Sequence, residues 1–282
     1  MSTFRCRQPL LPTLLAGLAT LCVPGSLAGG QAEAGNYELR DGIAAYESGR
    51  YGEAIDHFKR AAAANPAQVT AKKYLGMALA ETVVPGLDTP ENLEAAQQAI
   101  AVFLQVLEKD THDADSMQRI AAVEFSVKNF EEAKDWQKKV LNEDPKAAES
   151  AYMVGVIDWT LSHANVLAIL EPAGFSDDGE GNAKAPAALM GNIKAQNHAL
   201  VEEGIDYLNW AIKIRPDYED AMAYLNLVCR RKADLDWGDE AARKADLAEA
   251  NEWTIKAMNL RSASEKKAVG QKANQEAVSE QP

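Results

Sequence analysis

Residues 42–66, GIAAYESGRYGEAIDHFKRAAAANP, have the pattern of two short helices joined by a tight turn. Gly49 is expected to end the first helix, and Pro66 follows the second because proline lacks the N–H that a continuing helix needs. Small residues stand where two helices would touch, and large residues fill the space beside those contacts. The small residues are Gly42, Ala54 and Ala61, and the large ones are Tyr46, Tyr51, Ile55 and Phe58. A helix pair this short cannot bury its apolar side alone, so it needs a neighbour of the same kind.

The same pattern recurs along the chain. Counted from Gly42, the two small residues and the proline follow after 12, 19 and 24 positions, and the same steps from Ala121 reach Ala133, Val140 and Pro145. This arrangement resembles the tetratricopeptide repeat (TPR), a helix–turn–helix unit of 34 residues. The resemblance covers roughly residues 36–260. It implies an all-α, right-handed TPR-like superhelical solenoid of about five units, whose first helices line a concave groove where protein partners usually dock.

Three of the five units are longer than 34 residues, and the extra residues are predicted to lie in the turn inside each unit. The longest insert is about residues 161–190. Residues 161–170 are expected to extend the first helix of unit four, and residues 171–186 read as a loop because they are rich in Pro, Gly and Asp. Turns of this kind share one rim of a stacked array, so the insertions either form a functional rim or reflect the tolerance of loops to growth.

The two ends of the chain are expected to lie outside the solenoid. Residues 1–28 have the layout of a secretory signal peptide, with Arg5 and Arg7, an apolar run, and small residues before a cleavage site after Ala28. The apolar run is too short for a membrane helix, which needs about 20 residues. The chain is therefore expected to be exported, periplasmic or secreted, without stable membrane insertion. Residues 29–35 are expected to be a linker, 36–261 the solenoid, and 262–282 a disordered polar tail.

Charge and cysteine content limit the partners. The formal net charge is −13, and an acidic surface without a basic stretch disfavours nucleic acid as a partner. Removal of the signal peptide would leave Cys229 as the one cysteine, which excludes an internal disulfide. Cys229 lies in an apolar helical pattern and is expected to be a small buried side chain.

The sequence has no recognisable catalytic constellation. It lacks an H-E-x-x-H pair, a G-x-S-x-G elbow and a glycine-rich phosphate loop. The loop containing Asp177, Asp178, Glu180 and Asn182 resembles a calcium loop only faintly, because it lacks the glycine and the glutamate of that motif. His163 and His198 flank the insert, and two histidines alone do not make a zinc site. We therefore predict that the protein is not an enzyme and that it has no cofactor and no metal site.

The predicted site is the concave groove, where large apolar side chains stand on the non-packing face of the first helices. An exposed apolar patch usually marks an interaction site, so these residues are expected to bind a protein or peptide segment. They are Leu39, Ile43, Tyr46, Lys73, Met77, Gln118, Phe125, Tyr152, Val156, Trp159, Leu227 and Arg230. The resulting hypothesis is an exported, non-enzymatic scaffold. The alternatives are a structural subunit of a cell-envelope complex held through its rim loops, and a groove filled by the chain's own insert or tail.

Overall fold

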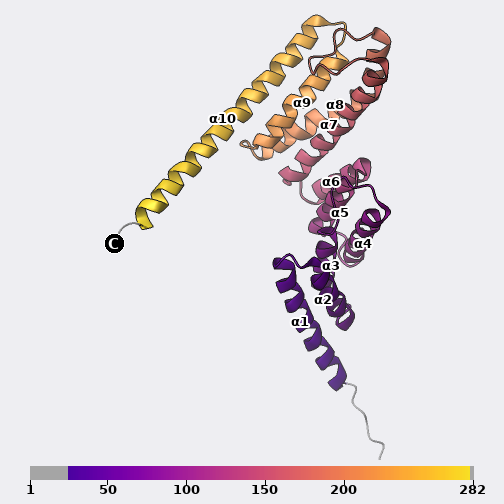
Figure 1. Ribbon diagram of the computed structural model, residues 1–282, viewed down its shortest axis with the longest axis vertical. Coiled ribbons are helices and arrows are strands. Elements are labelled where there is room, and N and C mark those ends of the chain that lie inside the picture. Colours follow the sequence, from indigo (N-terminus) through magenta and orange to yellow (C-terminus); the bar gives the residue numbers. More distant parts are fainter. Residues whose placement is uncertain (1–24, 280–282) are drawn as a thin grey trace, which may run out of the picture.

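The computed structural model describes the backbone of residues 25–279 and the side chains of residues 33–266, and all regular structure in this part is helical. Five antiparallel helix pairs follow one another along a curved array (Figure 1). The first helices of the pairs are α1 (Gly25–Glu47), α3 (Val69–Ala80), α5 (Ala114–Ser126), α7 (Ala148–Leu170) and α9 (Glu219–Leu235). The second helices are α2 (Tyr51–Ala64), α4 (Pro90–Leu107), α6 (Phe130–Glu143), α8 (Ala187–Ile214) and α10 (Glu240–Ser279). The all-α solenoid of five units that the sequence predicts is confirmed.

Within a unit, a small residue on the first helix lets the second helix approach closely. A methyl group at Gly42 would lie 2.6 Å from the ring of Phe58, and one at Gly76 would lie 2.8 Å from the ring of Phe103. Both rings are fully buried. The glycines therefore make room for the largest side chains of the core, as the spacing in the sequence indicates.

The first insertion, residues 81–89, is held in place by polar contacts. Thr89 caps α4 by accepting a hydrogen bond from the backbone N–H of Asn92, and Pro90 occupies the first turn. The buried side chain of Asn92 accepts from the N–H of Val84 at 2.8 Å and donates to the carbonyl of Leu87 at 2.8 Å. The N–H of Gly86 donates to the carbonyl of Ser126 at the end of α5, at 2.8 Å. This insertion therefore connects unit two to unit three.

The other two insertions differ from each other. In unit four, α7 continues to Leu170, a short 3-10 helix covers Glu171–Ala173, and α8 begins at Ala187. In unit five, only residues 236–239 separate α9 from α10. The extra residues of unit five do not form the longer turn that the sequence suggested; they extend the end of α9 and, to a greater extent, the start of α10.

The segments expected to flank the solenoid are helical where the structure describes them. Residues 29–35, expected to be a linker, belong to α1, and Gly35 packs so closely on α2 that a methyl group there would lie 3.1 Å from Ala64. The tail expected to be disordered continues α10 as far as Ser279, consistent with its content of Ala, Lys, Glu and Gln, which favour helices. Most of the proposed signal peptide, residues 1–24, lies outside the described residues.

The core is distributed along the array. One cluster joins units one to three, a larger one joins units three to five, and a third lies under the long insert around Leu170, Met190 and Ile193. Cys229 is buried in the larger cluster, as expected, and burial raises the pKa of its thiol to about 12. One stretch of the described chain, Ala148–Ala173, is long and apolar enough to cross a membrane. It is largely α7, which packs against α6, α8 and α9 as a core helix does.

Candidate functional site

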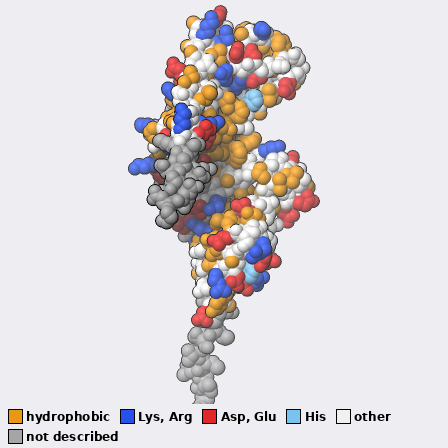
Figure 2. All heavy atoms as spheres, turned by 60° about the vertical axis from the view of Figure 1, so that its left-hand side comes forward, with side chains coloured by type: hydrophobic (Ala, Val, Ile, Leu, Met, Phe, Trp, Pro, Cys, Tyr) orange, Lys and Arg blue, Asp and Glu red, His pale blue; other side chains and the backbone are white. Residues whose placement is uncertain are grey.

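The inner face of the array is formed by the row of first helices, in which α1 contacts α3, α3 contacts α5, and α7 contacts α9. The array curves so that α1 and α10 lie on the same side (Figure 1). Figure 2 shows hydrophobic side chains gathered in the hollowed middle of the molecule. We call the surface of α1, α3, α5, α7 and α9 the inner face.

In unit one, the predicted groove residues take part in packing between units. Leu39, Ile43 and Tyr46 are half-buried against the N-terminal core cluster. The ring of Tyr46 lies 6.4 Å from that of Tyr74 on α3, and its hydroxyl donates to Glu81 at 3.2 Å. Tyr46 therefore connects α1 to α3, and all three side chains leave only part of their surface open to a partner.

In units two and three, a charge pair bridges neighbouring first helices. Lys73 of α3 forms an ion pair with Asp113, which also caps α5 by accepting from the N–H of Ser116 at 2.8 Å. Burial acts to raise the pKa of Asp113, but the hydrogen bonds from Lys73 and Ser116 and the charge of Lys73 together outweigh burial and lower the pKa below its ordinary value. Met77 and Gln118 are half-buried nearby. Lys73 is thus already engaged within the protein.

A pocket lies on the inner face between α3 and α5, beneath the first insertion. Its volume is about 440 Å³, and it is lined by Ala80, Glu81, Val83, Pro85, Arg119, Ala122, Val123 and Ser126. The walls are mostly apolar, and Glu81 and Arg119 supply one charge of each sign. Phe125 of the predicted set does not line this pocket but packs against Phe130 of α6, with ring centroids 5.3 Å apart.

The most extended group of aromatic side chains on the inner face spans α7 and α9. The rings of Tyr218, Tyr152, Tyr224, Trp159 and His163 follow one another, each within 5.0–5.6 Å of the next. We call these five side chains the aromatic row. Tyr152, Tyr224 and Trp159 are half-buried, and the imidazole of His163 stacks on Trp159 with the ring planes 8° apart. The sequence predicted only Tyr152 and Trp159. Tyr218 and Tyr224 join the row through the contact between α7 and α9, whereas His163 stacks on Trp159 one turn earlier on α7, a spacing that the sequence does contain.

Two predicted groove residues are not available to a partner. Val156 is 5% exposed, because α9 packs along α7, and it does not belong to the binding surface. Arg230 donates to the side chains of Asn226 at 3.1 Å and Asn251 at 3.0 Å, and to the carbonyl of Gly179 at 3.0 Å. Leu227, one turn before Arg230, is half-buried on the same helix.

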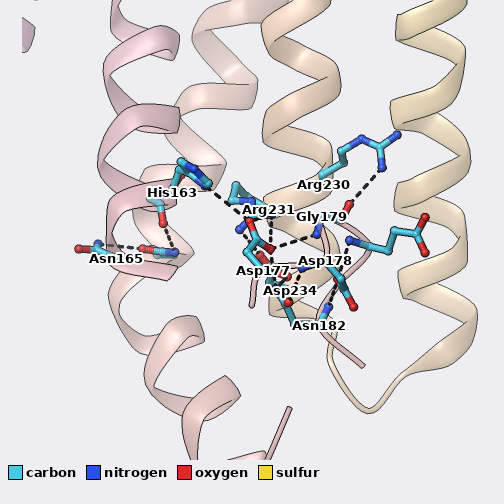
Figure 3. Close-up of polar contacts among 12 residues, drawn as sticks. His163, Asn165, Asp177, Asp178, Gly179, Asn182, Arg230, Arg231 and Asp234 are labelled. Atoms are coloured by element: carbon cyan, nitrogen blue, oxygen red, sulfur yellow. Dashed lines mark hydrogen bonds and ion pairs between the residues drawn. The ribbon is translucent and has the colours of Figure 1, made fainter. Parts of the chain in front are cut away.

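The long insert is bound to unit five through a buried polar cluster (Figure 3). Asp177 pairs with the buried guanidinium of Arg231 at 3.0 Å, and Asn182 donates to the carboxylate of Asp234 at 2.8 Å. Burial acts to raise the pKa of Asp177, but the charge of Arg231 and the hydrogen bonds from Arg231, Asn182 and Gly179 together outweigh burial and lower the pKa. Burial raises the pKa of Asp234 to about 7. The insert is therefore an ordered part of the array.

Further contacts of the insert involve its backbone. Arg230 of α9 binds the carbonyl of Gly179, and Arg243 of α10 binds the carbonyl of Glu180 at 2.8 Å. His163 of α7 approaches Asp177 at 3.6 Å, which brings the end of the aromatic row beside the insert (Figure 3). The insert thus connects unit four to unit five, as the first insertion connects unit two to unit three.

In the loop that faintly resembles a calcium site, one oxygen of Asp178 is engaged by the loop's own backbone. Asp178 accepts from the backbone N–H groups of Glu180 at 2.8 Å and Asn182 at 2.9 Å. His163 contacts Trp159 and Asp177, whereas His198 pairs with Glu202 at 3.3 Å. Among the described residues, no group of three or more His, Cys, Asp or Glu side chains is arranged to hold a metal ion.

Solved structures of other proteins show which class of fold this chain has. No protein-family model matches the chain, and no curated protein sequence matches it. Among solved structures, a crystal structure of MamA has a TM-score of 0.55 and 15% identity, covering 83% of this chain and 95% of the other. MamA from residue 41 to its end, from Desulfovibrio magneticus RS-1, has a TM-score of 0.55 and 17% identity, covering 83% and 98%. The chain therefore has the TPR-like solenoid fold that the sequence resemblance predicts.

Proposed function

We propose that the protein is a non-enzymatic scaffold that binds a segment of a partner protein along the inner face. The observation that carries the proposal is the aromatic row, in which Tyr152, Tyr224 and Trp159 keep part of their surface open to solvent. Aromatic side chains of this kind are the usual anchors of protein interfaces. The absence of a catalytic motif from the sequence agrees with a binding role.

The test is capture of a partner by variants that differ in one tryptophan. Trp159→Ala removes the tryptophan of the aromatic row, and Trp136→Ala removes a half-buried tryptophan from α6, a second helix. The immobilised protein is exposed to an extract of the envelope of its own cell, and helicity is checked by circular dichroism. We expect Trp159→Ala to lose the captured protein and Trp136→Ala to retain it. Equal capture by both variants would contradict the proposal.

A second candidate is a structural subunit held through its rim loops. Val84 is 52% exposed and Leu87 is 44% exposed, and both lie in the first insertion. Replacing both with Ser leaves the Asn92 contacts to the loop backbone in place. Loss of the captured protein in this variant, with retention in Trp159→Ala, would favour the rim over the inner face.

We also propose that the protein is exported, on the layout of residues 1–28. The chain would then be periplasmic or secreted, and no cofactor is assigned to it. Amino-terminal sequencing of the protein isolated from its own cell tests this proposal. A start after Ala28 supports export, and an intact Met1 on all of the protein contradicts it.

A further inference from the structure

The aromatic row has edge-to-face packing at its centre. The ring of Tyr152 meets that of Tyr224 at 5.6 Å and 81°, and Tyr224 meets Trp159 at 5.5 Å and 83°. Such packing fixes the rings in place, so that the half-exposed parts of Tyr152 and Trp159 form a rigid surface. The faces of aromatic rings carry partial negative charge and attract cations.

Two carboxylates stand at one end of this surface. Glu149 lies in the first turn of α7 and Asp220 in the first turn of α9, and both are exposed or nearly so. Glu149 precedes Tyr152 by three residues on α7, and Asp220 precedes Tyr224 by four residues on α9, so each carboxylate lies one helical turn from a ring of the aromatic row. Among the described side chains, no ion pair to Asp220 is formed. The end of the row is therefore a site of negative potential beside aromatic rings.

The protein itself places a cation at the edge of this site. The guanidinium of Arg215 lies over the ring of Tyr218 at 4.1 Å and approaches Glu149 at 3.9 Å. Tyr218 donates its hydroxyl to the same carboxylate at 2.5 Å. Arg215 contacts Tyr218 and approaches one oxygen of Glu149. In the part of the chain whose side chains are described, no cation lies over Tyr152 or Tyr224, so these rings and Asp220 remain for a second cation beside Glu149.

We propose that the aromatic row and the carboxylates of Glu149 and Asp220 together hold a lysine or arginine side chain of the partner segment. This inference rests on the proposed function and specifies its ligand. The cationic head lies between Glu149 and Asp220, and its methylene groups lie along the rings of Tyr152 and Tyr224. The negative net charge of the whole chain, −13, favours the approach of a basic segment.

The simpler role for Glu149 and Asp220 is stabilisation of two helix ends, since acidic side chains interact favourably with the positive end of the helix dipole. That role changes the stability of the protein but gives no preference among ligands. The two roles therefore separate in a binding experiment that compares ligands differing only in charge.

The experiment uses three fluorescein-labelled peptides with an identical alanine–leucine framework and a central lysine, norleucine or glutamate. Fluorescence anisotropy measures their affinities for the complete protein. We expect the lysine peptide to bind about tenfold more tightly than the norleucine peptide, and the glutamate peptide to bind most weakly. The double variant Glu149→Gln/Asp220→Asn should bind the lysine and norleucine peptides equally. Tyr152→Phe should keep the preference for lysine, and Tyr152→Leu should reduce it.

A matched control removes the same amount of charge elsewhere. Asp56→Asn/Glu252→Gln alters exposed carboxylates of α2 and α10, and it should keep the lysine preference. An unchanged preference in Glu149→Gln/Asp220→Asn, or equal affinities in the unaltered protein, would overturn the inference. Equal affinities that still depend on Trp159 would leave the inner face as the binding site and remove only its preference for a cation. Failure of every peptide to bind would overturn the inference, and the capture experiment would then decide the proposed function separately.

Discussion

A glycine on the first helix faces a large side chain on the second helix in three of the five units. The pairs are Gly42 with Phe58, Gly76 with Phe103, and Gly155 with Leu208. A methyl group at Gly155 would lie 2.4 Å from Cγ of Leu208, a branched atom close to its own backbone that cannot move aside easily. We therefore expect Gly155→Ala to lower the free energy of unfolding by about 1–3 kcal/mol, as measured by urea denaturation.

A second glycine provides the control. Gly191 lies inside α8, where an added methyl group would meet nothing within 4 Å. Alanine is the better helix former, so Gly191→Ala should raise the free energy of unfolding by about 0.5–1 kcal/mol. If Gly155→Ala also raised the free energy of unfolding, helix propensity and not close packing would decide the Gly155 position.

Among the helices, α6 differs from the other second helices at its contact with the next unit. Lys134 stands at the position that Ile55, Ile100 and Ile205 occupy in units one, two and four. It is buried and lies 2.9 Å from Asp158 of α7 and 3.3 Å from Glu203 of α8. Burial acts to lower the pKa of Lys134, but its bond to Asp158 and the nearby carboxylates outweigh this and raise the pKa. The junction between units three and four is thus partly ionic.

Removal of this cation should destabilise the junction. Lys134→Met leaves the carboxyl group of Asp158 buried without its counter-charge, and we expect a loss of about 3 kcal/mol at pH 8. The double variant Lys134→Met/Asp158→Ala should recover part of the loss, because the buried charge is then absent. Urea denaturation of the single and double variants measures both effects, and a double variant that is no more stable than Lys134→Met would contradict this account.

Asp158 at this junction and Asp234 beneath the long insert should make the stability of the protein depend on pH. Burial raises the pKa of Asp158 to about 7 from its ordinary 3.8, and burial raises the pKa of Asp234 to about 7 as well. Between the ordinary pKa and the raised pKa of these carboxyl groups, the folded state binds more protons than the unfolded state. The free energy of unfolding therefore falls as pH rises from about 4 to about 7 and then levels off. Each group contributes at most about 1.4 kcal/mol per pH unit.

Thermal unfolding between pH 5 and 8 checks this expectation. The melting temperature should be higher at pH 5 than at pH 8, and Asp158→Asn should flatten the dependence. Asp135→Asn, which changes an exposed carboxyl group of α6, should leave the dependence as it was. A melting temperature that stays constant or rises with pH over this range would contradict the expectation, because carboxyl groups with lowered pKa values, such as Asp177 and Glu203, change stability only below about pH 4.

Much of the arrangement of helices could be predicted from local residues, and the details of the site could not. Spacing and loop composition located the helix pairs and the loop of the long insert, since these depend on residues close together in the chain. Val156 shares a helix face with Tyr152 and Trp159, but its burial depends on α9 packing along α7. Arg230 is engaged by a backbone carbonyl of the insert, and a backbone contact between distant segments leaves no pattern in the sequence.

For the whole array, the last unit differs from the others in what covers it. Each second helix has one position that directly follows the small residue in contact with the first helix. In units two, three and four this position is buried or half-buried, and it is occupied by Leu107, Leu141 and Ile212. The equivalent residue of unit five is Met258, which is 66% exposed, and Ile255 beside it is 59% exposed. No further unit covers this side of α10 among the described residues. The terminal units of solenoids commonly carry a polar outer face, and α10 exposes two large apolar side chains among polar ones.

A charge at this terminal position should therefore be tolerated, whereas the same charge inside the array should not. We expect Met258→Glu to change the free energy of unfolding by no more than about 0.5 kcal/mol, because its side chain stays in water. Leu141→Glu should cost more than about 3 kcal/mol, because it buries an unpaired carboxylate between units three and four. Urea denaturation at two protein concentrations measures both variants. A large loss for Met258→Glu that grows with protein concentration would mean that a second copy covers α10, since only an association between molecules stabilises more as concentration increases.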